Sequence, residues 1–135
     1  MASLVTIVGK SLLHILASSC PIFQNVDVPR EQTICQYLLM GDRPMLLQHP
    51  ENDVRFRNLR LVVDNDIQFY AGFPIFSRDG LSVVGSLCCL DVRPREMTQS
   101  QYSTLLHLTR TASSIINTKC LKRRKKDLQR LQELE

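Results

Sequence analysis

The chain has 135 residues, of which 44% are hydrophobic and 22% are charged, and its formal net charge is +4. This length suits one compact domain, and the balance of apolar and charged residues excludes a disordered or a fibrous protein. Residues 1–118 carry ten basic and ten acidic side chains, whereas residues 119–135 carry seven basic and three acidic ones. The first 118 residues are therefore not a general binder of polyanions.

The first half of the chain is expected to form short elements separated by turns: strands near residues 3–8, 12–18 and 45–48, an irregular stretch over 19–28, a short helix near 30–39, and a helical turn over 50–59. Lys10 interrupts the apolar start of the chain, which favours a β-hairpin over a secretory signal peptide. Asp53 and Arg55 are expected to orient their loop through hydrogen bonds. Asp64 and Asp66 are interpreted as solvated loop residues, because calcium prefers six or more oxygen ligands.

Residues 67–91 give the strongest local pattern and predict two neighbouring strands, 67–75 and 81–91, joined by the turn 77–80. In the first strand, one set of residues is expected to point one way: Ile67, Phe69, Ala71, Phe73 and Ile75. The alternate set is expected to point the other way: Tyr70, Gly72, Pro74 and Phe76. Both sets are largely apolar, which indicates a central strand covered on both faces. Gly80 can supply the positive φ angle of the turn.

The last third of the chain predicts one long helix. Thr98 and Gln101 have the spacing of a capping box, and no helix breaker follows before Glu135. An apolar stripe at three- and four-residue spacing is expected to pack on the sheet: Tyr102, Leu105, Leu106, Thr109, Ala112, Ser113 and Ile116.

Several short motifs occur in a fixed order: Pro29-Arg30-Glu31 before Ile34-Cys35, Asp53-x-Arg55-Phe56, Phe69-Tyr70-Ala71-Gly72-x-Pro74, Gly85-Ser86-Leu87-Cys88 with Asp91, and Arg93-Pro94-Arg95. Together they resemble the motifs of GAF domains over roughly residues 3–118. The resemblance implies an α+β fold, with a central antiparallel sheet of five or six strands, helices on both faces and a long C-terminal helix. Two departures are Gln68, where this type of GAF domain usually has Arg, and the start, which lacks the opening helix of the family. We therefore expect an N-terminally shortened GAF-like domain over residues 1–118 and a basic helical extension over 119–135.

The resemblance also implies a function. GAF domains of this kind are non-enzymatic sensory or regulatory modules, which bind a small molecule or a partner and relay their state through the C-terminal helix. The ligand pocket would lie between the sheet and residues 29–66, and the resemblance places these residues in it: Cys35, Phe56, Phe69, Tyr70 and Cys88. The cofactor, if any, is not indicated by the sequence. No catalytic residue or metal site is expected, because the three histidines fall in no recognisable ligand spacing.

The five cysteines are Cys20, Cys35, Cys88, Cys89 and Cys120. Their odd number indicates free thiols in a reducing compartment, so we expect a cytoplasmic protein. We interpret them as small buried hydrophobic residues. An alternative activity is the reduction of free methionine sulfoxide, which some GAF proteins perform with a cysteine in the loop before the first long strand. Residues 58–66 contain no cysteine, which disfavours this thiol-dependent reductase.

The C-terminal extension allows several interpretations. Four leucines at near-heptad spacing predict a homodimer through parallel helices: Leu121, Leu128, Leu131 and Leu134. The same segment contains a basic patch, formed by Lys122, Arg123, Arg124, Lys125 and Lys126. The patch is either a solvated helix face, a site for an anionic membrane surface, or a nuclear-import signal, which would add a nuclear location. A further alternative for the whole chain is a ligand-free dimerisation or scaffold domain in a larger signalling or lipid-associated protein.

Overall fold

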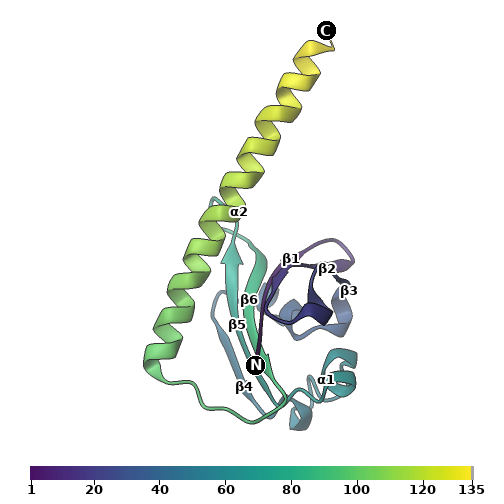
Figure 1. Ribbon diagram of the computed structural model, residues 1–135, viewed down its shortest axis with the longest axis vertical. Coiled ribbons are helices and arrows are strands. Elements are labelled where there is room, and N and C mark those ends of the chain that lie inside the picture. The colour runs from purple at the N-terminus through teal and green to yellow at the C-terminus, as the bar shows by residue number, and fades with distance from the viewer. Residues whose placement is uncertain (135) are drawn as a thin grey trace.

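A six-stranded antiparallel sheet forms the centre of the protein in the computed structural model, which describes residues 1–134 (Figure 1). The strand order is β3-β2-β1-β6-β5-β4. The strands are β1 (Ala2–Val8), β2 (Leu12–Ser18), β3 (Asp27–Pro29), β4 (Met45–Gln48), β5 (Phe69–Phe76) and β6 (Val83–Asp91). This architecture confirms the predicted α+β fold, and the sheet reaches the upper limit of the expected five or six strands.

Helices cover both faces of the sheet, as predicted. The long helix α2 (Gln99–Glu133) lies across one face and then runs beyond the sheet (Figure 1). The other face is covered by the parts of residues 29–66 on either side of strand β4, here called the cover, and by the segment that follows β2. These parts contain α1 (Arg60–Asn65) and the 3-10 helices η1 (Pro21–Phe23), η2 (Arg30–Gln32), η3 (Ile34–Met40) and η4 (Pro50–Asn52). No helix among residues 1–134 combines the length and the apolar character needed to cross a membrane.

The sheet has an apolar core on each face, because successive strand residues point in opposite directions. Phe69, Ala71 and Phe73 of β5 pack towards α2, where the Phe73 ring meets the Tyr102 ring at a centroid distance of 5.3 Å. Tyr70, between them in sequence, packs on the opposite face with residues of the cover. The predicted double burial of this strand is therefore confirmed, and every residue of β5 except the last is buried.

The turn and cap predictions are also confirmed. Gly80 has a φ angle of +74° between β5 and β6, a conformation that glycine adopts without steric cost. At the start of α2, the Thr98 hydroxyl accepts a hydrogen bond from the Gln101 backbone N–H at 3.1 Å, and the Gln101 side chain accepts one from the Thr98 N–H at 3.0 Å. These two reciprocal bonds form the capping box that fixes where the helix begins.

Three local predictions were wrong. The stretch predicted to be irregular contains the start of β3, whose Val28 pairs with Leu13 of β2. Asp64 lies in α1 and forms an ion pair with Arg60 at 3.4 Å, so it is not a loop residue. Ile67 precedes β5 and packs with the cover, on the face opposite Phe69. β3 and α1 are too short to show a hydrophobic period, so tertiary contacts decide their conformation.

Strands β1 and β6 meet at an unusually close seam. A Cβ atom added at Gly85 would overlap the carbonyl oxygen of Thr6, so only glycine fits at this point. One residue further along, the hydroxyls of Thr6 and Ser86 are hydrogen-bonded at 2.7 Å, and both residues are buried. This side-chain bond satisfies two polar groups in a region that has no access to water.

We expect Gly85→Ala to destabilise the protein by about 3 kcal/mol, because the added methyl group meets rigid backbone and must push β1 away from β6. Urea unfolding followed by circular dichroism measures this change. Gly41→Ala is the matched control, since a Cβ atom there meets nothing within 4 Å and the φ angle is an ordinary −143°. Equal unfolding midpoints for the two variants would contradict the close seam.

We expect Ser86→Ala to lower the free energy of unfolding by about 1–3 kcal/mol, because it leaves the buried Thr6 hydroxyl without its partner. The double variant Thr6→Val/Ser86→Ala removes both polar groups and should recover most of this loss. A double-mutant cycle from urea unfolding tests the coupling. Additive effects of the two single changes would show that the hydroxyls do not interact.

Candidate functional site

Four of the five residues predicted to line a pocket lie together beneath the cover. Cys35 comes from η3, Phe56 from the loop after η4, Tyr70 from β5 and Cys88 from β6, and none is more than 3% exposed. Phe69 lies on the opposite face of the sheet, in the core beneath α2. The alternation of side chains along a strand already predicts this separation, because neighbours such as Phe69 and Tyr70 point to opposite faces of the sheet and cannot line one pocket.

The loop that carries Phe56 is built by Asp53 and Arg55, as predicted. The Asp53 carboxylate accepts hydrogen bonds from the Arg55 backbone N–H at 2.9 Å and from its guanidinium Nε and Nη2 at 3.1 and 3.0 Å. The bond from the Arg55 side chain lowers the pKa of Asp53. The guanidinium carbon then lies 4.6 Å from the centroid of the Phe56 ring, and the Phe56 ring meets Tyr37 edge-on at 4.8 Å. This arrangement holds Phe56 in the core under the cover.

The polar side chains of the site include two thiols and one phenol. The sulfur of Cys35 lies 3.8 Å from the sulfur of Cys88, and the Tyr70 hydroxyl donates a hydrogen bond to the Cys35 sulfur at 3.3 Å. Gly72 makes room for this phenol, since a Cβ atom there would overlap the Tyr70 hydroxyl. Sequence reasoning missed the role of Gly72, and it missed the meeting of the two sulfurs because Cys35 and Cys88 lie on separate elements.

The two thiols differ in acidity. In the neutral pair the Cys35 thiol donates to the Cys88 sulfur. When Cys35 ionises, Cys88 donates to its thiolate instead, and this bond lowers the pKa of Cys35 to about 7, although burial opposes the shift; the bond from Tyr70 adds to the lowering. The same interaction raises the pKa of Cys88, because a proton on Cys88 stabilises the neighbouring thiolate. Burial raises the pKa of Tyr70. Cys35 is therefore the thiol that ionises first, and a thiolate is the nucleophilic form of cysteine.

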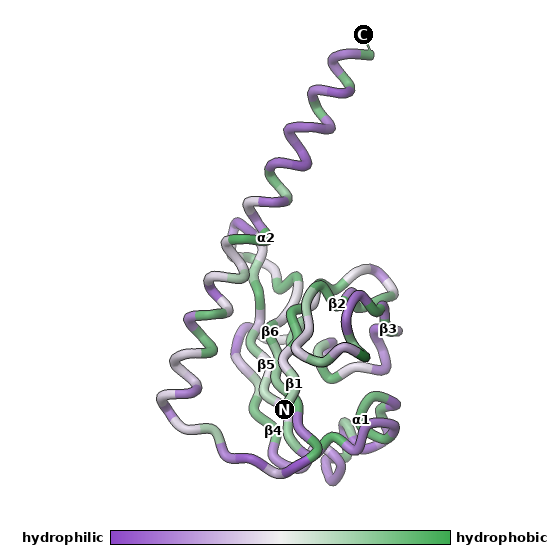
Figure 2. Tube along the Cα trace, viewed as in Figure 1, coloured by the Kyte–Doolittle hydropathy of each residue, from purple (hydrophilic) through white to green (hydrophobic). Residues whose placement is uncertain are grey.

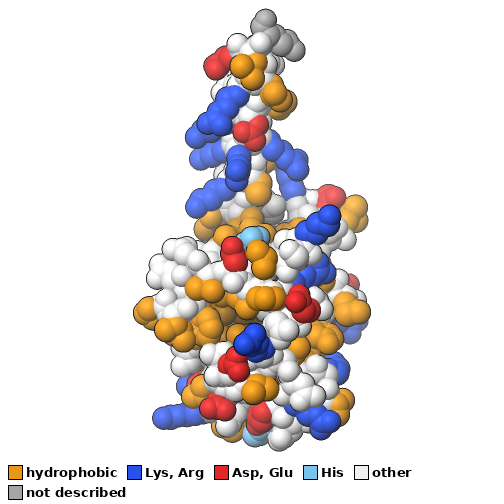
Figure 3. All heavy atoms as spheres, turned by 90° about the vertical axis from the view of Figure 1, so that its right-hand side faces the viewer, with side chains coloured by type: hydrophobic (Ala, Val, Ile, Leu, Met, Phe, Trp, Pro, Cys, Tyr) orange, Lys and Arg blue, Asp and Glu red, His pale blue; other side chains and the backbone are white. Residues whose placement is uncertain are grey.

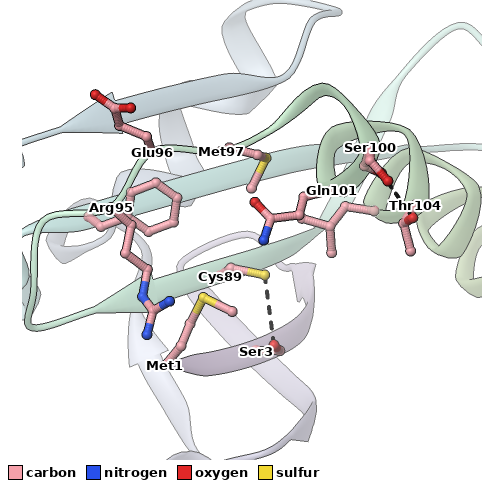
Figure 4. Close-up of a pocket in the computed structure, with 11 residues that line it drawn as sticks. Met1, Ser3, Cys89, Arg95, Glu96, Met97, Ser100, Gln101 and Thr104 are labelled. Atoms are coloured by element: carbon pink, nitrogen blue, oxygen red, sulfur yellow. Dashed lines mark hydrogen bonds between the residues drawn. The ribbon is translucent and has the colours of Figure 1, made fainter.

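The other face of the sheet has an open cavity of about 440 Å³, between β1, β6 and the first turns of α2 (Figure 4). Phe69 lines this cavity together with Cys89, whose side chain faces away from that of Cys88. Neighbouring side chains on a strand point to opposite faces, which gives the two cysteines these opposite orientations. The cavity itself was not predicted, because the expected pocket lay on the cover side.

Most polar groups around this cavity already have partners. Gln101 is engaged in the capping box, the Thr104 hydroxyl donates to the Ser100 carbonyl at 2.9 Å, and the Ser3 hydroxyl contacts the Cys89 sulfur at 3.7 Å. The Arg95 guanidinium donates to the Asp91 carboxylate, and this bond lowers the pKa of Asp91. The cavity therefore presents few free groups that would recognise a ligand specifically.

The remaining cysteines correct the prediction that all five are buried. Cys89 is buried, Cys20 is half-buried and Cys120 is exposed on α2. In residues 1–134, no group of three or more potential metal-ligating side chains lies close together. Cys35 and Cys88 are thus a pair of sulfurs without further acidic or imidazole ligands in this part of the chain.

The basic patch lies on the part of α2 that extends beyond the sheet, where Figure 3 shows lysine and arginine side chains gathered around the helix. Its five residues, Lys122 to Lys126, are all exposed. Leu128, Leu131 and Leu134 follow and are exposed too, whereas Leu121 is half-buried. Binding of this patch to an anionic membrane or an import receptor stays a prediction.

A comparison with known sequences matches the GAF domain family model to residues 4–116. A cyclic di-GMP phosphodiesterase, PA2567 of Pseudomonas aeruginosa, is 32% identical over 94 residues, which cover 68% of this chain and 16% of the phosphodiesterase. The chain thus spans about a sixth of the length of this curated relative.

Solved structures with the same fold include the GAF domain of an Acinetobacter phosphoenolpyruvate-protein phosphotransferase, with a TM-score of 0.71 and 15% identity over 91% of this chain and 74% of that one. They also include the phycocyanobilin-bound GAF domain of a cyanobacterial phytochrome, with a TM-score of 0.69 and 12% identity over 90% and 76%. At these identities the likeness shows the fold alone. The match of the family model to most of the chain, on a sheet with this topology, shows that the chain belongs to the GAF domain family.

Proposed function

We propose that this GAF domain is a non-enzymatic sensory module, which binds a small molecule or a partner beneath the cover and relays its state through α2 within a larger signalling protein. The supporting observation is the placement of α2. Its first half packs on β5 and β6, and its second half leaves the domain as a free helix (Figure 1). A helix anchored on the sheet at one end can transmit a shift of the sheet to whatever its other end contacts.

Strand β6 provides the physical link between the cover and α2. Cys88 faces the cover, and the next residue, Cys89, lies in the core beneath the helix. Because packed interiors deform little, a displacement of β6 on one face must move side chains on the other. A ligand that changes the position of the cover would in this way bias the position of α2.

We place the binding site beneath the cover rather than in the open cavity beneath α2. The cover contains the 3-10 helices η2, η3 and η4, whose hydrogen-bond geometry is poorer than that of α-helices, so it can open locally at a lower cost than the sheet. The site between the cover and the sheet combines aromatic rings with a phenol and two thiols. An apolar site with a few convergent polar groups is typical of small-molecule binding.

Native mass spectrometry of the reduced protein, purified from cells, tests for a retained small molecule. We expect Tyr70→Phe, which keeps the ring and removes the hydroxyl, to weaken retention, and Thr104→Val in the cavity beneath α2 to leave it unchanged. Hydrogen exchange with and without the ligand should change both in the cover and in α2. Retention that depends on Thr104 but not on Tyr70 would place the site beneath α2 instead.

We further propose that the module forms a homodimer through the extensions of parallel α2 helices. Leu128 and Leu131 are 60% and 61% exposed, although they carry large apolar side chains. An isolated helical segment of this length is only marginally stable in water, and pairing two copies would bury these leucines. The basic patches of the two copies would then lie close together, so added salt should strengthen the dimer by screening their repulsion.

We expect Leu128→Lys to shift the protein towards monomer, because it places a charge in the proposed helix seam. Gln129→Lys is the matched control: it adds the same charge one residue along, about 100° around the helix, and should leave the dimer intact. Sedimentation velocity at tens of micromolar distinguishes these outcomes. A monomer in the unaltered chain, or equal effects of the two changes, would overturn the proposal.

A further inference from the structure

We propose that Cys35 and Cys88 form a reversible disulfide when the protein meets hydrogen peroxide, which makes this buried thiol pair a redox-modification site. The inference does not rest on the proposed ligand, because it concerns the two sulfurs themselves. It differs from methionine sulfoxide reduction, since no organic substrate is turned over.

The geometry of the pair is the first argument. The two sulfurs are 3.8 Å apart, although the residues are 53 positions apart in sequence. A disulfide bond is about 2.05 Å long, so the sulfurs must approach by about 1.8 Å in total, shared between two side chains. One cysteine sits on η3 and the other on the central strand β6, so the cover can supply this movement.

The acidity of Cys35 and its contact with Cys88 are the second argument. Cys35 receives hydrogen bonds that favour its thiolate. Burial has the opposite effect on Cys89, the neighbour of Cys88 on β6, because it raises the pKa of the Cys89 thiol. Among residues 1–134, this is the pair of cysteines whose sulfurs are in hydrogen-bond contact. The thiolate and its resolving thiol are therefore already together in the reduced protein.

Access of the oxidant is the third step of the argument. Cys35 is 3% exposed and Cys88 is fully buried, so the reaction needs a local opening of η3. Peroxide is little larger than water, and η3 is a seven-residue 3-10 helix that packs on β5 and β6. Runs of 3-10 helix longer than three or four residues are uncommon because their hydrogen bonds are poorly aligned, which favours such an opening.

The chemistry balances with peroxide as the oxidant. The Cys35 thiolate attacks one peroxide oxygen, the O–O bond breaks, and the departing hydroxide takes up the proton that Cys35 released and leaves as water. The Cys88 sulfur then attacks the sulfur of the Cys35 sulfenic acid, the S–O bond breaks, and the hydroxyl group leaves with the Cys88 proton as a second water. The two sulfurs lose two electrons and the peroxide gains them; a dithiol reverses the reaction by exchange.

The structural consequence would be a covalent link between the cover and the centre of the sheet. The disulfide would hold η3 against β6 and close the site that the cover can otherwise expose. Because Cys89 lies on the helix side of the same strand, the link would also restrict the movement that reaches α2. Oxidation would thus lock the module in its closed form.

The test treats the reduced full-length chain, freed of any retained small molecule, with hydrogen peroxide, then blocks the remaining thiols and maps the products by mass spectrometry. We expect the loss of two hydrogen atoms, a peptide that links Cys35 to Cys88, slower hydrogen exchange in η3, and full reversal by dithiothreitol. The same treatment in concentrated urea should lose this pairing preference. Mapping in the unaltered chain does not depend on the folding of any variant.

Two variants and one control variant assign the steps. Cys88→Ser should stop the reaction at a Cys35 sulfenic acid, which dimedone traps, and the matched neighbour Cys89→Ser should still form the disulfide. Cys35→Ser should slow oxidation by at least about tenfold, because the nucleophilic thiolate is lost. Unreacted Cys35 and Cys88 in the unaltered chain, or linkage mainly through Cys20 or Cys120, would overturn the proposal. Neither result bears on the proposed ligand binding, since the retention experiment uses reduced protein.

Discussion

The structure depends above all on strand β6, which is paired on both edges and buried on both faces. It bonds to β1 on one side and to β5 on the other, and the bare backbone of Gly85 allows β1 to approach. Because strand side chains alternate, Cys88 and Leu90 enter the core beneath the cover, while Leu87 and Cys89 enter the core beneath α2. One strand thus joins the candidate site to the helix that leaves the domain.

The core beneath the cover is mostly apolar, but it contains several polar side-chain atoms that contact one another. The hydroxyl pair of Thr6 and Ser86 lies on the same face of the sheet as the thiols of Cys35 and Cys88 and the phenol of Tyr70. Buried polar groups are costly unless they are bonded to one another, and each of these groups has such a partner. This arrangement fixes the geometry of the core and brings two sulfurs into contact.

Helix α2 has two halves with different roles. The first half packs its stripe on the sheet, and Thr109 is fully enclosed there, with its hydroxyl bonded to the Leu105 carbonyl at 2.7 Å. The second half is strongly polar and carries the basic patch, as the hydropathy of the chain shows (Figure 2). A helical segment of this kind is only marginally stable when isolated in water, which is consistent with a segment that acts by contacting another chain or another module.

Strong local signals in the sequence predict several elements of the fold correctly. The apolar residues of β5 and β6, the glycine turn between them, the capping box and the stripe of α2 all follow from period, turn chemistry and capping. The alternation within β5 even separates Phe69 from Tyr70, although both were assigned to one pocket. Tertiary structure decided the rest: the edge strand β3, the one-and-a-half-turn helix α1, and above all the contact between Cys35 and Cys88. The contact between the two cysteines joins residues that are 53 positions apart in the sequence. No local sequence preference can predict it, because it forms only when the cover packs onto a sheet built from the whole chain.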